Sequence, residues 1–310
     1  MGTAKLYKGI DAMKFLMAFD VVAMHTTVGN PLGIKDLAVP FFFLASGFFL
    51  FKKLDLCRPE EESACQKKWL SRIARLYLLW TAIYLPFTVY GFVKGGNSFV
   101  HSLALFFRNL LFVGENYLSW PLWYLLGMIW AGCMIFLLRK LRVPVWGMLI
   151  IGIGLMLAAQ LLDFESNGLY HSLFKTTRNG IFMGFPFMVA GGMASKFDVA
   201  RVSPIVWLAA FLALLVCSKF AAWLVLPAAV ALFLFAASIK DISFVSESLS
   251  HGLRQSGVVI YLSHMVFAGV LIICGMQKGL ALFAITSVCA LALAFLMRSP
   301  KCEGVVKLLY

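Results

Sequence analysis

Long apolar runs, separated by short polar stretches, dominate the pattern of this chain. An α-helix needs about 17–25 consecutive apolar residues to cross a bilayer, and about ten runs approach that length. We therefore predict an all-α polytopic membrane protein, a bundle of about ten transmembrane helices, the eighth kinked at Pro227. The predicted helices are 10–29, 37–51, 69–93, 119–138, 144–162, 178–195, 203–218, 220–238, 256–274 and 279–298.

One further apolar segment, 99–113, differs from the other ten. It is short and carries His101 and Arg108, so we interpret it as an interfacial or re-entrant helix. If it crossed the membrane, every later segment would reverse its orientation and the basic residues would be scattered over both sides.

The lysines and arginines indicate how the helices are oriented. With the N-terminus in the cytoplasm and ten crossings, about twenty of the 27 basic residues fall on the inner side, as the positive-inside rule requires. We expect a multi-pass protein with both termini cytoplasmic. The net charge of +13 then reflects topology and contact with anionic membrane lipids, and it predicts no nucleic-acid partner.

Composition supports the membrane interpretation. The 310 residues are 62% hydrophobic and 13% charged, and the mean hydropathy is +0.89, which excludes an ordinary soluble protein. The longest hydrophilic stretch, 52–68, is too short to fold alone. We expect one integral membrane domain over 1–310, with the first apolar segment retained because no small-residue cleavage site follows it.

The cysteines and the absence of nucleotide motifs narrow the chemistry. The seven cysteines show no metal-ligand spacing, so we expect no metal cofactor. Cys57 and Cys65 fall in an inner loop, where thiols stay reduced. The sequence has no P-loop, no glycine-rich dinucleotide turn and no serine nucleophile elbow, which argues against an ATP-driven pump.

The first apolar segment carries a polar face. Asp11, Lys14 and His25 lie within it, and ionisable groups inside a membrane span usually serve a function. Lys14 and His25 are about three helical turns apart, so both side chains point the same way, roughly 16 Å from each other along the axis. Asp11 lies one turn below Lys14. Charge neutralisation between Asp11 and Lys14 is the alternative explanation for that pair.

Five short motifs occur in order along the chain. They are GID at 9–11 with Lys14 and His25, VPFFFLASGFFL at 39–50, SRIARLY at 71–77, LWYL at 122–125 and VVIYLSHMVF at 258–267. Together they resemble the type-3 family of integral membrane acyltransferases. The family more often has arginine at the position of Lys14, and lysine cannot form a bidentate clamp. The resemblance implies an acyl-CoA-dependent O-acyltransferase of a bacterial cytoplasmic membrane.

A branch of this family adds a second hypothesis. GIDAMKFLMAFDVVAMHT, VPFFFLASG, LWYL and TRNGIFMGFPFMVAGG (177–192) also look like the membrane domain of vancomycin-resistance serine racemases, in which a soluble racemase domain follows. That branch implies a transporter or permease for a small amino acid such as serine. Transporters often show paired repeats with broken helices, and we find no convincing repeat. A non-catalytic sensor would leave the ordered motifs unexplained.

The acyl donor expected from the resemblance, acetyl-CoA or another acyl-CoA, is polyanionic and cytosolic. Arg72 and Arg75, one turn apart at the inner end of the third helix and preceded by Lys68, can bind its phosphates. The alternative is that these basic residues only fix the orientation of the protein in the membrane. His264 is predicted to line the donor tunnel or to form an interhelical hydrogen bond. Ser46 is a further donor-site candidate, although close helix packing is its plainer explanation.

The expected acceptor is a hydroxyl of an extracytoplasmic or lipid-linked cell-envelope glycan. Neutral imidazole suits a general base, so His25 is predicted to take the acceptor proton, with Lys14 and Asp11 as helpers; the alternative is a structural interhelical hydrogen bond from His25. No oligomeric state is predicted. Candidate acceptor-binding residues on the outer side are Trp123, Tyr124, Glu115, Arg178 and Asn179, of which the aromatic residues can equally be interfacial anchors.

Overall fold

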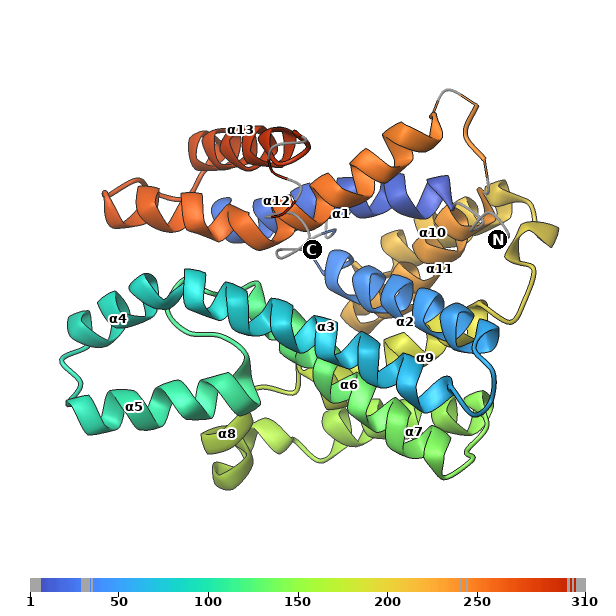
Figure 1. Ribbon diagram of the computed structural model, residues 1–310, viewed down its shortest axis with the longest axis horizontal. Coiled ribbons are helices and arrows are strands. Elements are labelled where there is room, and N and C mark those ends of the chain that lie inside the picture. The colour runs from blue at the N-terminus through green and yellow to red at the C-terminus, as the bar shows by residue number, and fades with distance from the viewer. Residues whose placement is uncertain are drawn as a thin grey trace. The chain divides into compact units, whose positions relative to one another are not determined.

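The computed structural model describes residues 7–28, 34, 36–239, 241–243, 245–299, 302 and 304. Within these residues all regular structure is helical, with thirteen α-helices and a few short 3₁₀ and π turns (Figure 1). The predicted all-α class is therefore confirmed. Contacts divide the chain into two compact units, one of 1–45 and 197–310 and one of 46–196. The boundary falls within α2, and the prediction of one membrane domain stays a prediction.

The first unit is built around two parallel helices, α1 and α12. α13 packs against both of them and runs antiparallel to α12 (Figure 1). α10 and α11 form a hairpin, of which α11 packs against α1. The backbone N–H of Gly279 donates to the carbonyl of Thr26 at 2.9 Å and ties the α12–α13 turn to the end of α1. The helices of this unit are α1 (Lys8–Thr26), the first turns of α2 (Ala38–Leu56), α10 (Pro204–Cys217), α11 (Val225–Ser238), α12 (Glu247–Ile273) and α13 (Leu280–Leu296).

The second unit contains the middle of the chain. Its principal packing pairs are α3 with α6 and α7 with α9. One face of α3, which includes Trp69, Ile73 and Leu76, is buried, so the opposite face is free for charged side chains. The helices are the remainder of α2, α3 (Glu62–Ile83), α4 (Leu85–Lys94), α5 (Phe99–Arg108), α6 (Leu122–Lys140), α7 (Val145–Leu161), α8 (Gly168–Phe174) and α9 (Phe185–Ala194); π turns at Asn109–Val113 and Gly180–Gly184 extend α5 and precede α9.

Helix length supports the membrane prediction only in part. Each of the ten predicted segments contains a helix. Among the described residues, however, only α6 and α12 are both long and apolar enough to cross a membrane, and α3 with α4 adds a third if the pair, bent by 51°, is one span. α1 is interrupted by four charged side chains, and α7 and α13 have 17 residues each. The count of ten crossings is thus not confirmed by the helices themselves.

The structure agrees with the helical prediction for 99–113 but not with the predicted kink at Pro227. The segment 99–113 is helical, as α5 and its π turn, and ends at Gly114, whose φ of +85° favours glycine. The kink predicted within a helix at Pro227 is wrong. α11 begins only at Val225, so Pro227 lies in the first helical turn, where the missing N–H has no intrahelical acceptor to lose.

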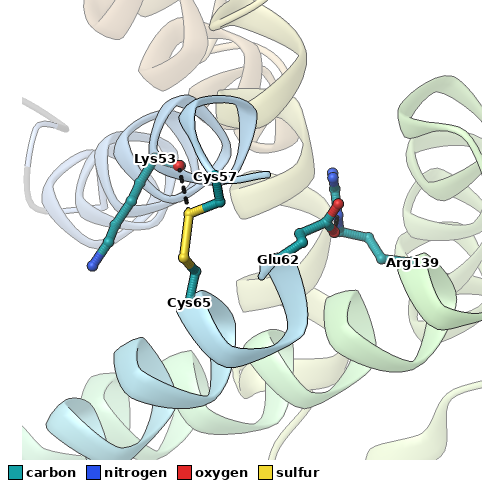
Figure 2. The surroundings of a disulfide bond; sticks show 5 residues. All are labelled: Lys53, Cys57, Glu62, Cys65 and Arg139. Carbon is teal, nitrogen blue, oxygen red and sulfur yellow. Dashed lines mark hydrogen bonds and ion pairs between the residues drawn. A yellow bond between two sulfur atoms is a disulfide. The ribbon is translucent and has the colours of Figure 1, made fainter. Parts of the chain in front are cut away.

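The loop between α2 and α3 holds a disulfide bond. Cys57, just after α2, is bonded to Cys65 in the first turn of α3, next to the ion pair of Glu62 with Arg139 (Figure 2). Our expectation that Cys57 and Cys65 are free thiols is therefore wrong for this structure. The connection 57–61 is a tight turn between two helices, and it brings together two cysteines that the sequence alone shows only as eight positions apart.

Replacing Cys57 with serine is expected to lower the free energy of unfolding of the oxidised protein by about 2–3 kcal/mol. Without the disulfide, the unfolded chain is no longer restricted by the loop that the bond closes between two cysteines eight positions apart. Thermal unfolding in detergent without reductant measures the effect. Cys217→Ser, at an exposed free cysteine, is the matched control and should not change stability. Equal melting temperatures for Cys57→Ser and the wild type would show that the bond contributes nothing.

Candidate functional site

Polar side chains line the contact between α1 and α12. The positions Ser250, Gly257 and His264 on α12 lie beside Asp11, Phe15 and His25 on α1, respectively. Their spacing of seven residues keeps them on one helical stripe. Because the two helices are parallel, this row extends for about 20 Å along the interface. We call this row the seam: its two ends are polar, and in its middle Gly257 lies against the backbone of Phe15.

At one end of the seam the His25 and His264 rings are stacked. Their centroids are 5.4 Å apart and the ring planes differ by 18°. His264 is completely buried, and its Nδ1 lies 2.7 Å from the carbonyl oxygen of Tyr261. A carbonyl only accepts, so Nδ1 carries the proton and Nε2 keeps its lone pair. The fold thus sets the tautomer of His264.

Two buried polar atoms lie at this end of the seam. The Nε2 of His264 and the Oγ of the adjacent Ser263 have no hydrogen-bond partner among the described residues. Buried polar atoms in native proteins are nearly always satisfied, so such atoms point to a water or a substrate group. Tyr261, one turn earlier, packs its ring at 5.3 Å from that of Phe42, which joins the second and fifth sequence motifs here.

At the other end of the seam Asp11 is buried. Its Oδ2 accepts a hydrogen bond from Ser250 Oγ at 2.9 Å, and the positive charges of Arg254 and Lys14 act on the carboxylate. The direct hydrogen-bond partner of Asp11 is Ser250, and the charge neutralisation of Asp11 by Lys14 stays a prediction. Neither Ser250 nor Arg254 was singled out from the sequence.

The predicted donor residues in the second unit form a basic stripe. Lys68, Arg72 and Arg75 are all exposed on α3, at spacings of four and three residues that place them on one face. That face is opposite the side that packs against α6. The stripe extends for about 10 Å along the helix, a length over which three cations can bind more than one phosphate group.

The remaining donor candidate, Ser46, contacts a residue predicted for the acceptor. Ser46 Oγ and Tyr124 Oη are 2.9 Å apart. Gly47, next to Ser46, explains why α2 comes so close to its neighbour: a Cβ built on Gly47 would lie 1.8 Å from the carbonyl oxygen of Met188. The packing interpretation of this Ser-Gly pair is thus supported, and the hydrogen bond joins a predicted donor residue to a predicted acceptor residue.

Among the predicted acceptor residues, Asn179 caps the turn before α9. Asn179 accepts hydrogen bonds from the N–H groups of Ile181 and Phe182 at 2.9 and 3.2 Å, and its Nδ2 donates to Tyr170 Oη and to the carbonyl of Thr176. Its side chain is fully used in capping the turn before α9. Arg178 is exposed beside it.

Glu115 lies in the loop after α5. Burial raises the pKa of Glu115, and the charge of Lys175 opposes that shift. A carboxyl group of this kind stays protonated to a higher pH than an ordinary glutamate and can then donate a hydrogen bond. Trp123 begins α6 on the far side of the same loop, so the two candidates flank one short segment.

A carboxylate missed from the sequence organises the loop before Asn179. Glu165 Oε1 accepts hydrogen bonds from Thr177 N at 2.6 Å and from the hydroxyls of Thr177 and Thr176, both at 2.8 Å. These bonds, that from Thr177 N foremost, hold the pKa of Glu165 below its usual value. The only sequence signal is Thr-Thr next to Arg178, which does not reveal a partner eleven residues away.

Because the pKa of Glu165 is lower in the folded protein, its hydrogen bonds contribute their full stabilisation of the loop at a pH above about 4.3, the ordinary glutamate pKa. This stabilisation is lost as the pH falls through the lowered pKa of the folded state. We expect the Thr177 amide to be protected from hydrogen exchange at neutral pH and to lose protection in acid, after correction for intrinsic exchange. Glu165→Ala should expose this amide at every pH. Unchanged protection in Glu165→Ala would contradict the assignment.

Within the described ranges no group of three or more His, Cys, Asp or Glu side chains is arranged to hold a metal ion.

Comparison with known proteins gives four findings. The model of the acyltransferase 3 family, an acyltransferase domain, matches residues 7–298. The chain is similar to an amino-acid racemase of Enterococcus faecalis, 32% identical over 212 residues, which are 61% of this chain and 28% of the relative. It is also similar to a serine/alanine racemase of Enterococcus gallinarum, 27% identical over 211 residues, 61% of this chain and 29% of the relative. The chain matches less than a third of each relative, and no solved structure matches it.

Proposed function

Because the chain belongs to the acyltransferase 3 family of membrane acyltransferases, we propose that it transfers an acyl group, acetyl in the simplest case, from acyl-CoA to a hydroxyl group. The acceptor that we propose is an extracytoplasmic or lipid-linked glycan of the cell envelope. The observation that carries this proposal is the His25–His264 pair, 5.4 Å between centroids, inside an apolar layer.

The pair can move the proton that O-acylation requires. The acceptor hydroxyl gives its proton to the imidazole of His25 as its oxygen attacks the thioester carbonyl carbon. The carbon–sulfur bond then breaks, and the CoA thiolate takes the proton back, which yields an ester and free CoA. With its proton on Nδ1, His264 is neutral and adds no positive charge beside His25, so no such charge opposes the transfer of the acceptor proton to His25.

The basic stripe on α3 is proposed as the binding site for the phosphates of CoA. Lys68, Arg72 and Arg75 share one exposed face, and guanidinium groups bind phosphate oxygens in a bidentate manner. Among the residues that the structure describes, the ion pair of α3 is that of Glu62 with Arg139, and none is found for Lys68, Arg72 or Arg75.

We also propose that the ten predicted segments all cross a bacterial cytoplasmic membrane, with both termini inside. The basic-residue distribution supports this orientation. The ion pair of Lys8 with Asp241 at 2.6 Å brings the start of α1 and the segment before α12 together, and the antiparallel α13 returns Arg298 to the same end. The Cys57–Cys65 loop then faces the cytoplasm, where a disulfide is normally reduced.

Maleimide labelling tests this orientation. In intact cells, a membrane-impermeant maleimide is expected not to label Cys57 or Cys65, with or without a reductant added outside. After permeabilisation both should be labelled without added reductant. Labelling from outside once an external reductant has opened the bond would place this loop on the outer side and reverse the proposed orientation.

The names of the relatives favour one alternative function, the transport of a small amino acid. Their names, amino-acid racemase and serine/alanine racemase, are consistent with a membrane portion that carries a small amino acid, with the α1–α12 seam as part of its path. Uptake of labelled serine into proteoliposomes distinguishes the two functions. Serine uptake without acyl transfer would favour the transporter, whereas CoA release without uptake would favour the acyltransferase.

A further inference from the structure

A groove of about 440 Å³ lies within the first unit, between α1, α12 and α13. Its lining is almost entirely apolar and includes Phe15, Leu253, Val288, Leu291, Ala292 and Phe295, and Arg298 lies among the lining residues as well. The groove does not include His25 or His264, so the proposed transfer chemistry leaves it unexplained.

The α13 side of the groove runs along the helix axis. Val288, Leu291 and Phe295 are three and four residues apart and therefore share one face. Val288 and Phe295 are 66% and 72% exposed, which fits side chains that meet lipid rather than protein. From Val288 to Arg298 the helix and its last turn rise about 15 Å, which is half of the roughly 30 Å hydrocarbon thickness of a bilayer. The groove has the length of one leaflet.

Arg298 places a positive charge at the end of the groove. α13 ends at Leu296, so the guanidinium lies just beyond the helix and is exposed. It rests against Gly252 of α12: a Cβ on Gly252 would lie 2.6 Å from Nη2 and 2.7 Å from Cζ of Arg298. The missing side chain at Gly252 is what allows the guanidinium to lie there, beside the apolar lining.

We propose that this groove binds one anionic phospholipid, with an acyl chain along Val288 to Phe295 and its phosphate at Arg298. A guanidinium binds phosphate through paired charge-assisted hydrogen bonds. Apolar lining alone would accept any lipid, and the charge of Arg298 selects an anionic headgroup. In the proposed orientation this end faces the cytoplasmic leaflet, which carries the anionic lipids. The site is independent of the proposed acyl transfer.

Lipid titration followed by native mass spectrometry tests the site. The full chain in neutral detergent is titrated with phosphatidylglycerol and with phosphatidylcholine of the same acyl chains. We expect one bound phosphatidylglycerol and weaker binding of phosphatidylcholine. Arg298→Gln should weaken phosphatidylglycerol binding about fivefold, and Ala292→Phe, which fills the groove, should abolish the bound lipid. The matched controls Arg201→Gln and Ala209→Phe lie at exposed positions of the same unit and should bind as the wild type does.

Three outcomes would overturn the proposal. Equal binding of the two lipids would show that Arg298 does not select charge. Unchanged lipid binding in both Arg298→Gln and Ala292→Phe would place the bound lipid elsewhere. Loss of a dimer in Ala292→Phe, without any change in lipid binding, would show that a second copy of the chain occupies the groove.

Discussion

Replacing His25 with alanine is expected to reduce the rate of acyl transfer by about 10²–10⁴-fold, the usual contribution of a positioned general base. His25 stacks on His264 at 5.4 Å between centroids, and its removal leaves only the completely buried His264 imidazole at this end of the seam, which is not the proposed acceptor of the proton. CoA release from acetyl-CoA by the purified protein measures the effect. Expression and melting temperature should change little, because the exposed part of His25 contributes modestly to packing.

Two variants separate chemistry from general damage. His101→Ala, on the exposed α5, removes a histidine outside the seam and should retain the wild-type rate. His264→Gln keeps a polar side chain but loses the stacked ring, so we expect an intermediate loss and a changed pH profile. If His25→Ala retained near-wild-type turnover, the proposed role of His25 would be wrong.

The Arg72→Ala/Arg75→Ala double variant is expected to raise KM for acyl-CoA about 10²-fold, because each hydrogen bond to a charged phosphate contributes about 1.5–3 kcal/mol and exposure to water reduces that contribution. The two side chains share the exposed face of α3 with Lys68. The kcat at saturating acyl-CoA should fall much less, since these residues bind the donor and do not touch the reacting carbonyl.

The control for this variant is Arg58→Ala. Arg58 is a basic, exposed residue of the α2–α3 connection, away from the α3 stripe, and its removal should leave KM unchanged. An Arg72→Lys/Arg75→Lys variant keeps the charge without bidentate geometry and should give an intermediate KM. If the alanine variant changed only the orientation of the protein in the membrane, the topological explanation of these arginines would replace the donor site.

Much of the fold follows from the apolar pattern. Each predicted segment contains a helix, because a helix satisfies the backbone hydrogen bonds of an apolar run within the run itself. The helix ends depend on local geometry, which the pattern does not contain. Pro227 was assigned to a helix interior because the apolar run starts several residues before the helix does.

The candidate site could be predicted on α1 but only partly on α12. Asp11, Lys14 and His25 are visible because charge is rare in an apolar run. On α12, the stripe of Ser250, Gly257 and His264 is recognisable only once its spacing is compared with α1, since serine and glycine are common in membrane helices. The pairing of Cys57 with Cys65 depends on the turn between two helices, which the cysteine spacing does not define.

The most direct test of the account is turnover of radiolabelled acetyl-CoA by the purified protein in nanodiscs, with wild type, His25→Ala and Arg72→Ala/Arg75→Ala compared side by side. The account predicts saturable binding in the wild type and in His25→Ala, CoA release in the wild type alone at low donor concentration, and weak binding in the arginine variant. Absence of acetyl-CoA binding in all three proteins, together with serine uptake by the wild type in proteoliposomes, would contradict it.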